Sequence, residues 1–211
     1  MRSSDIPDGP AGLRADKQPK QERSRRTKAQ ILEVAAGIFA EQGYSTVTLQ
    51  DVADRASMTK GAVYFHFTNK EALATAVVQE HYLRWQPILE EVRERGLRPL
   101  ESVLAVMDRV AEVFQTDTVV QAGARLQLER SLIGAELPRP YLGWQGMLTE
   151  MLTEAAEAGQ LRPGTDPAAL ARVLVSSFFG LQHISDVLTG RADLMERYTE
   201  MRDIVFLGVT A

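Results

Sequence analysis

The sequence predicts an all-α protein, in which an N-terminal three-helix helix-turn-helix domain precedes a C-terminal helical bundle. Three observations support this prediction. Apolar residues recur with the 3.6-residue period of a helix along most of the chain, and no stretch of useful length shows the alternation of a strand. Segments that contain Gly and Pro interrupt the helical pattern at intervals. The chain of 211 residues is long enough for one large domain or two small ones.

The first helix follows a segment that has little to bury. Residues 1–22 are rich in Pro, Gly, Ser, Asp and Lys, which predicts a disordered tail. A helical pattern begins at about Thr27 and ends at Gly43. Its apolar stripe consists of Ile31, Val34, Ala35, Ile38 and Phe39.

Two short helices joined by a tight turn are expected next. Thr48 is interpreted as an N-cap, because Asp51 follows three residues later in the position of a capping box. Leu49, Val52 and Ala53 form the apolar face of a helix of about eight residues. Residues 56–58 form the turn, and a second short helix is expected over 59–65.

The rest of the chain is predicted to be helical as well. Asn69 is expected to cap a long helix that continues to about residue 93. Breaks are expected at 94–99, 137–140 and 161–167, and helices over 100–115, 118–132, 141–159, 168–189 and 193–207.

The last two helices have the pattern of a subunit interface. The 168–189 helix is apolar almost all round, so it is expected to be buried on every side. In the last helix one face carries Leu194, Tyr198, Met201, Val205 and Gly208. Together the two helices are expected to form half of the four-helix interface of a homodimer. The alternative is that the last helix only closes its own subunit.

Composition and motifs exclude several functional classes. The chain has no cysteine, which excludes disulfides, thiolate metal sites and a cysteine nucleophile. Its three histidines are scattered, so we expect neither a metal nor a cofactor. No P-loop, nucleotide-binding glycine motif, nucleophile elbow or zinc-protease motif is present, so no catalytic residue is assigned and an enzyme is not expected. The sequence also lacks a membrane-spanning apolar run and a secretion-signal core, which predicts a cytoplasmic protein.

The charge is distributed unevenly along the chain. The net charge is −4, which argues weakly against a nucleic-acid binder. Residues 17–28 nevertheless carry six basic side chains and one acidic side chain, so one end of an acidic protein is basic. Within this window Arg25, Arg26 and Lys28 are expected to contact DNA phosphates or a flanking minor groove.

The second short helix suits the DNA major groove, which is about 12 Å wide and admits one helix. It begins with the small or polar residues Thr59, Lys60, Gly61 and Ala62, which allow close approach to base edges. Tyr64 and His66 follow toward the far end, where they are expected to contact phosphates. Two alternatives remain open from these residues: a helical domain that binds no DNA, and an adaptor whose basic arm binds another acidic partner.

The stretch from residue 29 to residue 72 closely resembles the N-terminal domain of the tetracycline-repressor (TetR) family. The resemblance is carried by Gly43-Tyr44, by residues 48–53, and by Gly61, Tyr64, His66, Phe67, Lys70 and Glu71. It implies a homodimeric, ligand-responsive repressor that binds a pseudo-palindromic double-stranded DNA operator. The positions that it assigns to DNA contact are Thr48, Thr59, Lys60, Gly61, Ala62, Tyr64, His66 and Lys70, whereas Val63 and Phe65 are expected to pack the two short helices together. The expected domains are a tail at 1–22, a helix-turn-helix domain at 23–69 and a ligand-binding and dimerisation domain at 70–211.

Shorter strings resemble the γ-butyrolactone-receptor branch of this family. They are TKGAVYFHF (59–67), QAGARLQLER (121–130), PYLGW (140–144) and AGQLR (158–162). The resemblance implies regulation of antibiotic genes by a small autoregulator of γ-butyrolactone, furan or butenolide type, with Trp144 in the ligand cavity. The alternative is a pseudo-receptor that responds to an antibiotic or another lipophilic compound.

A cavity with apolar walls and a few polar groups is expected in the C-terminal bundle. Gln127 is the best candidate, because its amide is alone on an inward face and can both donate and accept hydrogen bonds. The residues expected to line the cavity are Tyr82, Trp85, Gln127, Tyr141, Trp144, Phe178 and Gln182. The alternative is that the aromatic residues are ordinary core and that Gln182 pairs across the dimer interface. His81 and His183 are interpreted as ordinary core or surface residues, and the helix over 69–93 as the link between cavity and DNA domain.

Overall fold

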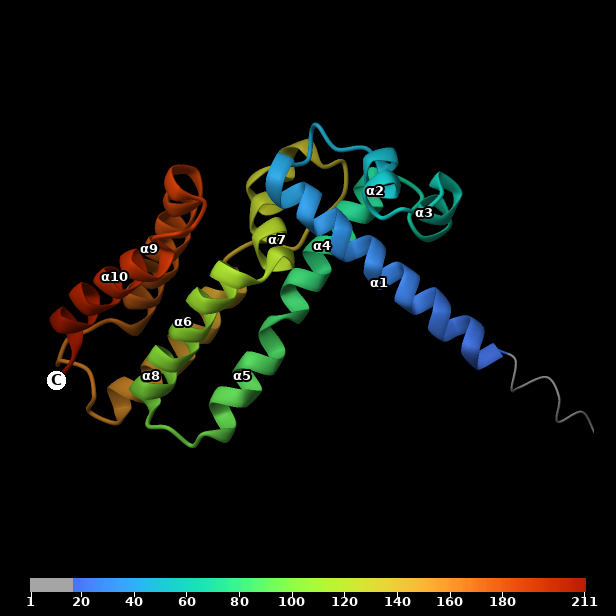
Figure 1. Cartoon of the computed structure of the whole chain (residues 1–211). Coiled ribbons are helices and arrows are strands. Elements are labelled where there is room, and N and C mark those ends of the chain that lie inside the picture. The colour runs from blue at the N-terminus through green and yellow to red at the C-terminus, as the bar shows by residue number, and fades with distance from the viewer. Residues whose placement is uncertain (1–16) are drawn as a thin grey trace, which may run out of the picture.

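The computed structural model describes residues 17–211 and confirms the all-α prediction (Figure 1). Apart from one isolated antiparallel bridge between Leu161 and Thr210, the regular elements of this described part are helices. They are α1 (Lys17–Gln42), α2 (Leu49–Arg55), α3 (Lys60–His66), α4 (Lys70–Leu83), α5 (Trp85–Glu94), α6 (Pro99–Thr116), α7 (Thr118–Leu128), the short 3-10 helix η2 (Arg130–Leu132), α8 (Leu142–Glu157), α9 (Pro167–Thr189) and α10 (Leu194–Val209).

Two hydrophobic clusters organise these helices. The first holds helices α1, α2, α3 and α4 together, with buried residues such as Phe39, Val52, Val63 and Leu73. The second joins α5, α6, α8, α9 and α10, with Phe114, Leu152 and Phe178 inside it. Burial of apolar area contributes about 25 cal/mol per Å², so each cluster is a main source of stability for its part of the chain.

Helix α7 belongs to both clusters. Val119, Ala122 and Leu126 on one face pack in the first cluster, whereas Val120 and Ala124 pack in the second. The helix lies along α1 and α4, far from them in the sequence. It is therefore the wall that the two parts of the protein share.

Helix α1 begins at Lys17, which corrects the expected start at about Thr27 and the expected tail over residues 17–22. Its first turns carry few apolar residues, so no hydrophobic period marked them. Lys, Gln, Glu and Arg are nevertheless good helix formers, and Glu22 pairs with Arg26 one turn later. Pro19 lies in the first turn, where a proline is tolerated. The rest of the expected tail, residues 1–16, lies outside the described residues.

The prediction of one long helix over 69–93 is wrong, because this segment forms two helices, α4 and α5, that are divided at Arg84. Pro87 explains the division: it has no N–H to donate to the carbonyl of Leu83, and its ring crowds that carbonyl. The Arg84 Nε at the joint donates to Asp117 Oδ2 over 3.1 Å. Since Asp117 is the N-cap of α7, the joint is attached to the shared wall.

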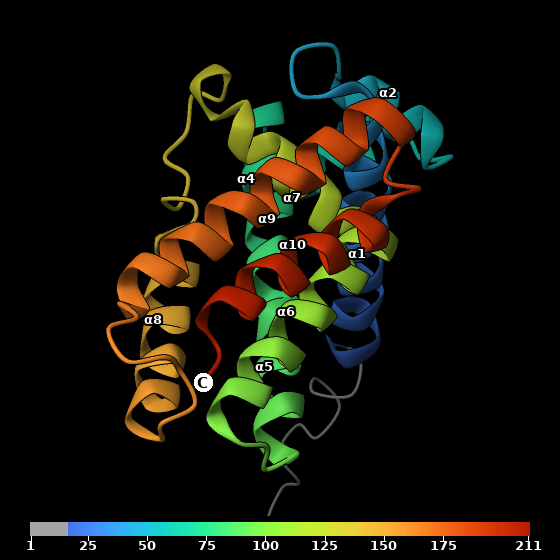
Figure 2. The same cartoon turned by 90° about the vertical axis from the view of Figure 1, so that its left-hand side faces the viewer.

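Helices α9 and α10 pack against each other across one side of the molecule (Figure 2). The predicted interface face of α10 is wrong, because Leu194 and Tyr198 are fully buried in their own subunit. The Tyr198 hydroxyl donates to Asp108 Oδ1 on α6 over 2.6 Å, which fixes this face inward. Helix α9 is also not buried on every side. The exposed large apolar side chains of the two helices are Val173, Ile184, Val187, Leu188, Ile204 and Leu207.

Two other helix limits differ from expectation. The helix expected over 118–132 ends at Leu128 and continues only as η2. Helix α8 begins at Leu142, because Tyr141 before it has a left-handed backbone with φ of 69°. Such a conformation is uncommon for a residue with a side chain, and it turns the chain sharply after Pro140.

Candidate DNA-binding surface and ligand cavity

The helix-turn-helix follows from two capped short helices, as predicted. The Thr48 hydroxyl accepts from the Asp51 N–H, and Asp51 accepts from the Thr48 N–H, which completes the capping box. Thr59 caps α3 in the same way by accepting from the Ala62 N–H. Val52 and Val63 are fully buried and hold the two helices together. Both threonines are thus fixed at helix starts, with their hydroxyl groups used for capping.

The outward face of α3 is open and partly aromatic. Lys60 and Gly61 are exposed at its start, and the Lys60 ammonium lies 5.5 Å from the centre of the Tyr64 ring. A Cβ added to Gly61 would meet no atom of the protein within 4 Å. Packing within the chain therefore does not require glycine at this position.

Phe65 corrects the sequence prediction. It was expected to pack α2 against α3, but 80% of its surface is exposed, whereas Val63 is buried as expected. The helix has two turns, and Val63 and Phe67 already fill its inner side. Phe65 consequently stands on the outer surface beside His66, whose ring centre is 5.1 Å away. With Tyr64, which is also exposed, Phe65 gives the outer side of α3 two aromatic side chains.

Lys70 lies at the edge of this surface and is engaged within the protein. Its ammonium donates to the carbonyls of Tyr44 and Ser45 over 3.0 and 3.3 Å and lies over the Tyr44 ring. The Tyr44 hydroxyl in turn donates to Glu71 over 3.0 Å. Burial and this carboxylate raise the pKa of Tyr44 to about 12. Lys70 therefore fastens the start of α4 to the loop before α2.

The basic side chains Arg25, Arg26 and Lys28 are exposed on the first half of α1. This half extends beyond the rest of the molecule on the side where α2 and α3 lie (Figure 1). The Lys28 ammonium is 5.7 Å from the centre of the Phe67 ring, immediately after α3. The basic arm and the outward face of α3 therefore lie on the same side of the protein.

A small cavity lies between α4, α7, α8 and α9. Its volume is about 10 Å³, which is about the space of one water molecule. A small organic ligand can therefore enter only if the walls move apart. The lining residues are His81, Tyr82, Ala124, Gln127, Pro140, Tyr141, Trp144, Phe179 and Gln182.

Two buried amides supply most of the polarity of this cavity. The Gln127 Nε2 donates to the Tyr82 hydroxyl over 3.0 Å and to the Pro138 carbonyl over 3.3 Å. The Gln182 Nε2 donates to the carbonyl of Phe179. The Oε1 atoms of both amides are buried and have no hydrogen-bond partner in residues 17–211. Leaving such an acceptor unpaired costs about 1–3 kcal/mol, so both are well suited to accept a hydrogen bond from a ligand.

The predicted lining residues are placed as follows. Tyr82, Gln127, Tyr141, Trp144 and Gln182 surround the cavity.

Two residues that were predicted to line the cavity do not line it, and two residues that were not predicted do. Trp85 lies behind the cavity, with its ring centre 5.2 Å from that of Trp144. Phe178 is buried in the core against Phe114 and Tyr198 instead. The next residue, Phe179, is the one at the cavity wall, and His81 was missed as a lining residue. Because neighbouring helix positions differ by about 100° in direction, helix phase alone did not separate Phe178 from Phe179.

His81 is a buried residue that joins two helices. Its Nδ1 lies 3.0 Å from the carbonyl oxygen of Val120 on α7. Burial lowers the pKa of His81 to about 4, although the Val120 carbonyl and the Asp117 carboxylate oppose this shift. The imidazole is therefore neutral near pH 7 and serves as a hydrogen-bonding core residue.

Comparison with known proteins identifies the family. Residues 31–77 match "Bacterial regulatory proteins, tetR family", and residues 97–211 match "Tetracyclin repressor-like, C-terminal domain". The second match alone covers more than half of the chain. The chain belongs to the TetR family. The two matched regions correspond to the helix-turn-helix part and to the bundle that contains the cavity.

Individual relatives within the TetR family are also similar. The A-factor receptor protein of Streptomyces griseus is 35% identical over 182 residues, which are 86% of this chain and 63% of that protein. The chain thus spans less than two thirds of that relative. The repressor DhaR of Mycobacterium sp. (strain GP1) is 26% identical over 71% of this chain and 77% of its own length.

Solved structures show the same fold. One, described as "Molecular basis for control of antibiotic production by a bacterial hormones", is 56% identical with a TM-score of 0.82, and the match covers 88% of this chain and 98% of that one. A γ-butyrolactone receptor described as ArpA-like is 28% identical with a TM-score of 0.76, over 89% and 90% of the two chains.

No helix in residues 17–211 is long and apolar enough to cross a membrane. In the same range no cluster of acidic or histidine side chains is arranged to hold a metal ion.

Proposed function

We propose that this TetR-family protein is a transcriptional repressor that binds a pseudo-palindromic operator as a homodimer and is released by a small autoregulator. The observation that carries the DNA half is the outward face of α3. Gly61 leaves open space there, and Lys60, Tyr64 and Phe65 project from the same surface. A helix with such a face reads base edges in the major groove, while the basic arm of α1 contacts phosphates.

The dimer half rests on exposed apolar side chains. Ile204 and Leu207 on α10 are more than 70% exposed in the single chain, and Val187 and Leu188 on α9 are nearly as open. A patch of this kind on one side indicates a protein–protein contact. In a two-fold dimer formed through α9 and α10, binding to half-sites one turn apart requires the two α3 helices to lie about 34 Å apart on the same DNA face.

The effector half rests on the cavity. Aromatic walls suit a lipophilic body, and the free Oε1 atoms of Gln127 and Gln182 suit a hydroxyl donor. The likeness to the A-factor receptor and to a γ-butyrolactone receptor favours a γ-butyrolactone, furan or butenolide autoregulator and control of antibiotic genes. No catalytic activity, cofactor or membrane partner belongs to this function, and the expected location is the cytoplasm.

The DNA half is tested by selecting duplexes from a random pool with the purified protein and measuring their affinity by fluorescence anisotropy. The expected product is a pseudo-palindrome bound by a dimer. Lys60→Ala and Tyr64→Ala should lose most of this affinity and keep the dimer, whereas Arg95→Ala, which removes an exposed cation at the end of α5, should keep both. Failure to enrich any sequence would contradict the proposal.

The effector half is tested by intrinsic fluorescence. Of the two tryptophans of the chain, Trp144 lines the cavity and Trp85 packs against it from behind. Synthetic γ-butyrolactones should change their emission in a saturable manner, and Gln127→Leu should weaken this binding. If antibiotics change the emission and no γ-butyrolactone does, the protein is a pseudo-receptor of the same family. If neither class changes it, the proposed effector site is wrong.

A further inference from the structure

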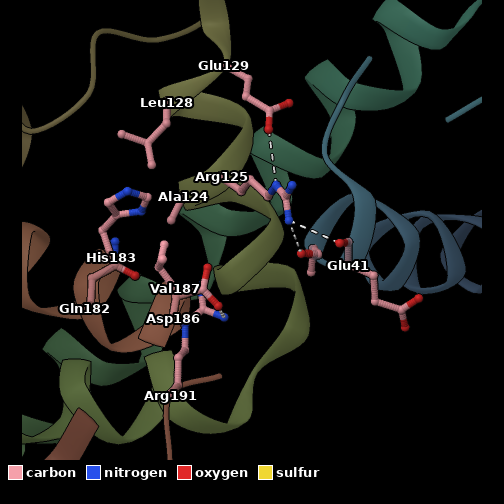
Figure 3. A pocket seen from close by; sticks show the side chains of 11 residues that line it. Glu41, Ala124, Arg125, Leu128, Glu129, Gln182, His183, Asp186, Val187 and Arg191 are labelled. Atoms are coloured by element: carbon pink, nitrogen blue, oxygen red, sulfur yellow. Dashed lines mark hydrogen bonds and ion pairs between the residues drawn. The ribbon is translucent and has the colours of Figure 1, made fainter. Parts of the chain in front are cut away.

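Helix α7 carries two functional faces only one residue apart. Ala124 and Gln127 line the cavity, whereas Arg125 and Glu129 extend the other way, toward the end of α1 (Figure 3). A helix is stiff, so its residues move together when it shifts or rotates. A displacement of the cavity wall must therefore displace Arg125 and Glu129 as well.

Arg125 and Glu129 hold the junction between α1 and α2. The Arg125 Nη1 donates to the carbonyls of Ala40 and Glu41 over 2.8 and 3.2 Å, and its Nε donates to Glu129 Oε1 over 3.1 Å. The other Glu129 oxygen accepts from the backbone N–H of Tyr44. Two of these four hydrogen bonds fix carbonyls in the last turn of α1, one holds the Tyr44 N–H beyond it, and the fourth joins the two side chains to each other. We name this pair of side chains the α7 clamp.

The position of the α7 clamp gives it control over the helix-turn-helix. A helix end leaves unpaired carbonyls that some group must satisfy, and here a helix from the other half of the chain does so. Gly43 makes the turn with a φ of +77° and lies against Glu129. Only three residues separate Tyr44 from the Thr48 cap of α2. The clamp therefore sets the direction in which the chain enters the DNA-binding helices.

Space beside the clamp allows α7 to move. A pocket of about 570 Å³ lies between α1, α7 and α9, and Arg125 and Glu129 form part of its wall (Figure 3). Ala124 and Gln182 line both this pocket and the 10 Å³ cavity. Opening the small cavity can therefore push α7 toward a region that is not densely packed.

We propose that the α7 clamp transmits the state of the cavity to the DNA-binding helices. This inference rests on the proposed function, and it adds Arg125 and Glu129 as a connection beside helix α4, which itself runs from the DNA-binding helices to the cavity wall at His81 and Tyr82. By linkage, DNA binding must then change the affinity of the cavity for its ligand by the same factor by which the ligand changes the affinity for DNA.

The reciprocal effect can be measured without knowing the effector. Trp144 lines the cavity and Trp85 packs against Trp144, whereas DNA would bind at the outward face of α3. Acrylamide quenching of tryptophan is measured in the full-length dimer with and without a duplex selected by the protein from a random pool. The wild-type protein should show a change in quenching on binding the duplex. Glu129→Ala and Arg125→Met should lose most of that change at saturating duplex.

Two further variants make this test specific. Glu129→Gln keeps an acceptor for the Tyr44 N–H and loses the charge, so it should retain the fold even if Glu129→Ala does not, and it should show a smaller loss. Arg55→Gln removes the 2.8 Å ion pair between Arg55 and Glu41, at the same end of α1 but without touching α7, and it should leave the quenching change intact. Thermal unfolding by circular dichroism confirms that each variant is folded.

The outcomes separate the inference from the proposed function. If the pool yields no bound duplex, the proposed function fails and the inference fails with it. If a duplex binds but wild-type quenching does not change, the cavity and the DNA surface are uncoupled and the inference is overturned. If quenching changes equally in the wild type and in both clamp variants, coupling exists but the clamp does not carry it.

Discussion

Gly123 on α7 lies directly against His81 on α4, so closely that a methyl group at position 123 would overlap the imidazole side chain. The contact allows α7 to approach α4 and brings the Val120 carbonyl within 3.0 Å of the His81 Nδ1. A glycine is required here for packing rather than for backbone freedom. The close approach fixes the shared wall between the DNA-binding helices and the cavity.

Gly123→Ala should therefore destabilise the protein. Inserting a methyl group into a packed contact typically costs about 1–3 kcal/mol, and each kcal/mol lowers Tm by roughly 2–4 °C in a chain of this size. The matched control is Gly146→Ala on α8, where a Cβ would meet nothing within 4 Å. The control should be neutral or stabilising, and equal Tm values for the two variants in a calorimetric scan would contradict the packing interpretation.

The stability of the protein should depend on pH through His81. Its pKa in the folded state is about 4, below the ordinary value of 6.5. Between these values the unfolded chain binds more protons, so stability is complete above about pH 6.5 and falls as the pH is lowered toward 4. At about 1.4 kcal/mol per pKa unit, the loss is on the order of 3 kcal/mol.

Urea unfolding at pH 7.5, 6 and 5 measures this loss. His81→Asn, which keeps a donor near the Val120 carbonyl, should be less stable at pH 7.5 but should show a flatter pH dependence. The exposed His183 provides the control, because His183→Gln should leave the pH dependence unchanged. An identical slope in the wild type and His81→Asn would assign the pH dependence to other groups.

Gly61→Leu separates folding from DNA binding. Leucine is a better helix former than glycine by up to about 1 kcal/mol, and a Cβ at this exposed position meets no protein atom within 4 Å. Tm should therefore stay the same or rise, while the affinity for the selected duplex falls sharply because the side chain blocks approach to the groove. Full affinity in the anisotropy assay would remove Gly61 from the DNA surface.

Phe65→Ala should also lower the affinity for DNA with little effect on stability, because it removes a contact rather than blocking one. Truncation of a buried Phe to Ala costs about 3–5 kcal/mol of stability. Because the Phe65 side chain is 80% exposed, Phe65→Ala should cost much less, and Tm should change little. Operator affinity should fall, since an exposed aromatic ring on α3 is placed to contact sugar or thymine methyl groups. The buried residue Val63 on the same helix gives the contrast, because Val63→Ala should lower Tm.

Local rules predicted most elements, and tertiary packing explains most of the errors. The capping box at Thr48 and the cap at Asn69 depend only on nearby residues, and both form as predicted. The start of α1 was missed because a helix without an apolar stripe leaves no periodic signal. The inward face of α10 was misassigned because its burial depends on Asp108, which is 90 residues away from Tyr198.

The candidate site was predictable to the same extent. Gln127 could be selected because an amide alone on an inward helix face is unusual, whereas Trp144 was assigned through the resemblance of PYLGW (140–144) to the γ-butyrolactone-receptor branch. The placement of Phe65 outside and of Phe179 at the cavity depends on which of two adjacent positions the neighbouring helices cover. The hydrogen bond between Tyr44 and Glu129, which are 85 residues apart, has no local signature at all. The sharing of α7 between two cores was therefore visible only in the structure.

The most direct test of the central proposal is release of the protein from its operator by an autoregulator. Release is measured as a fall in the fluorescence anisotropy of a labelled duplex that was selected by the wild-type protein. Synthetic γ-butyrolactones, furans, butenolides and lipophilic antibiotics are titrated in turn. One class should release the wild-type protein at nanomolar to micromolar concentration, whereas Gln127→Leu should bind the duplex normally and resist release. If no compound releases the wild type, or if Gln127→Leu is released equally well, the proposal of a ligand-released repressor with this cavity is contradicted.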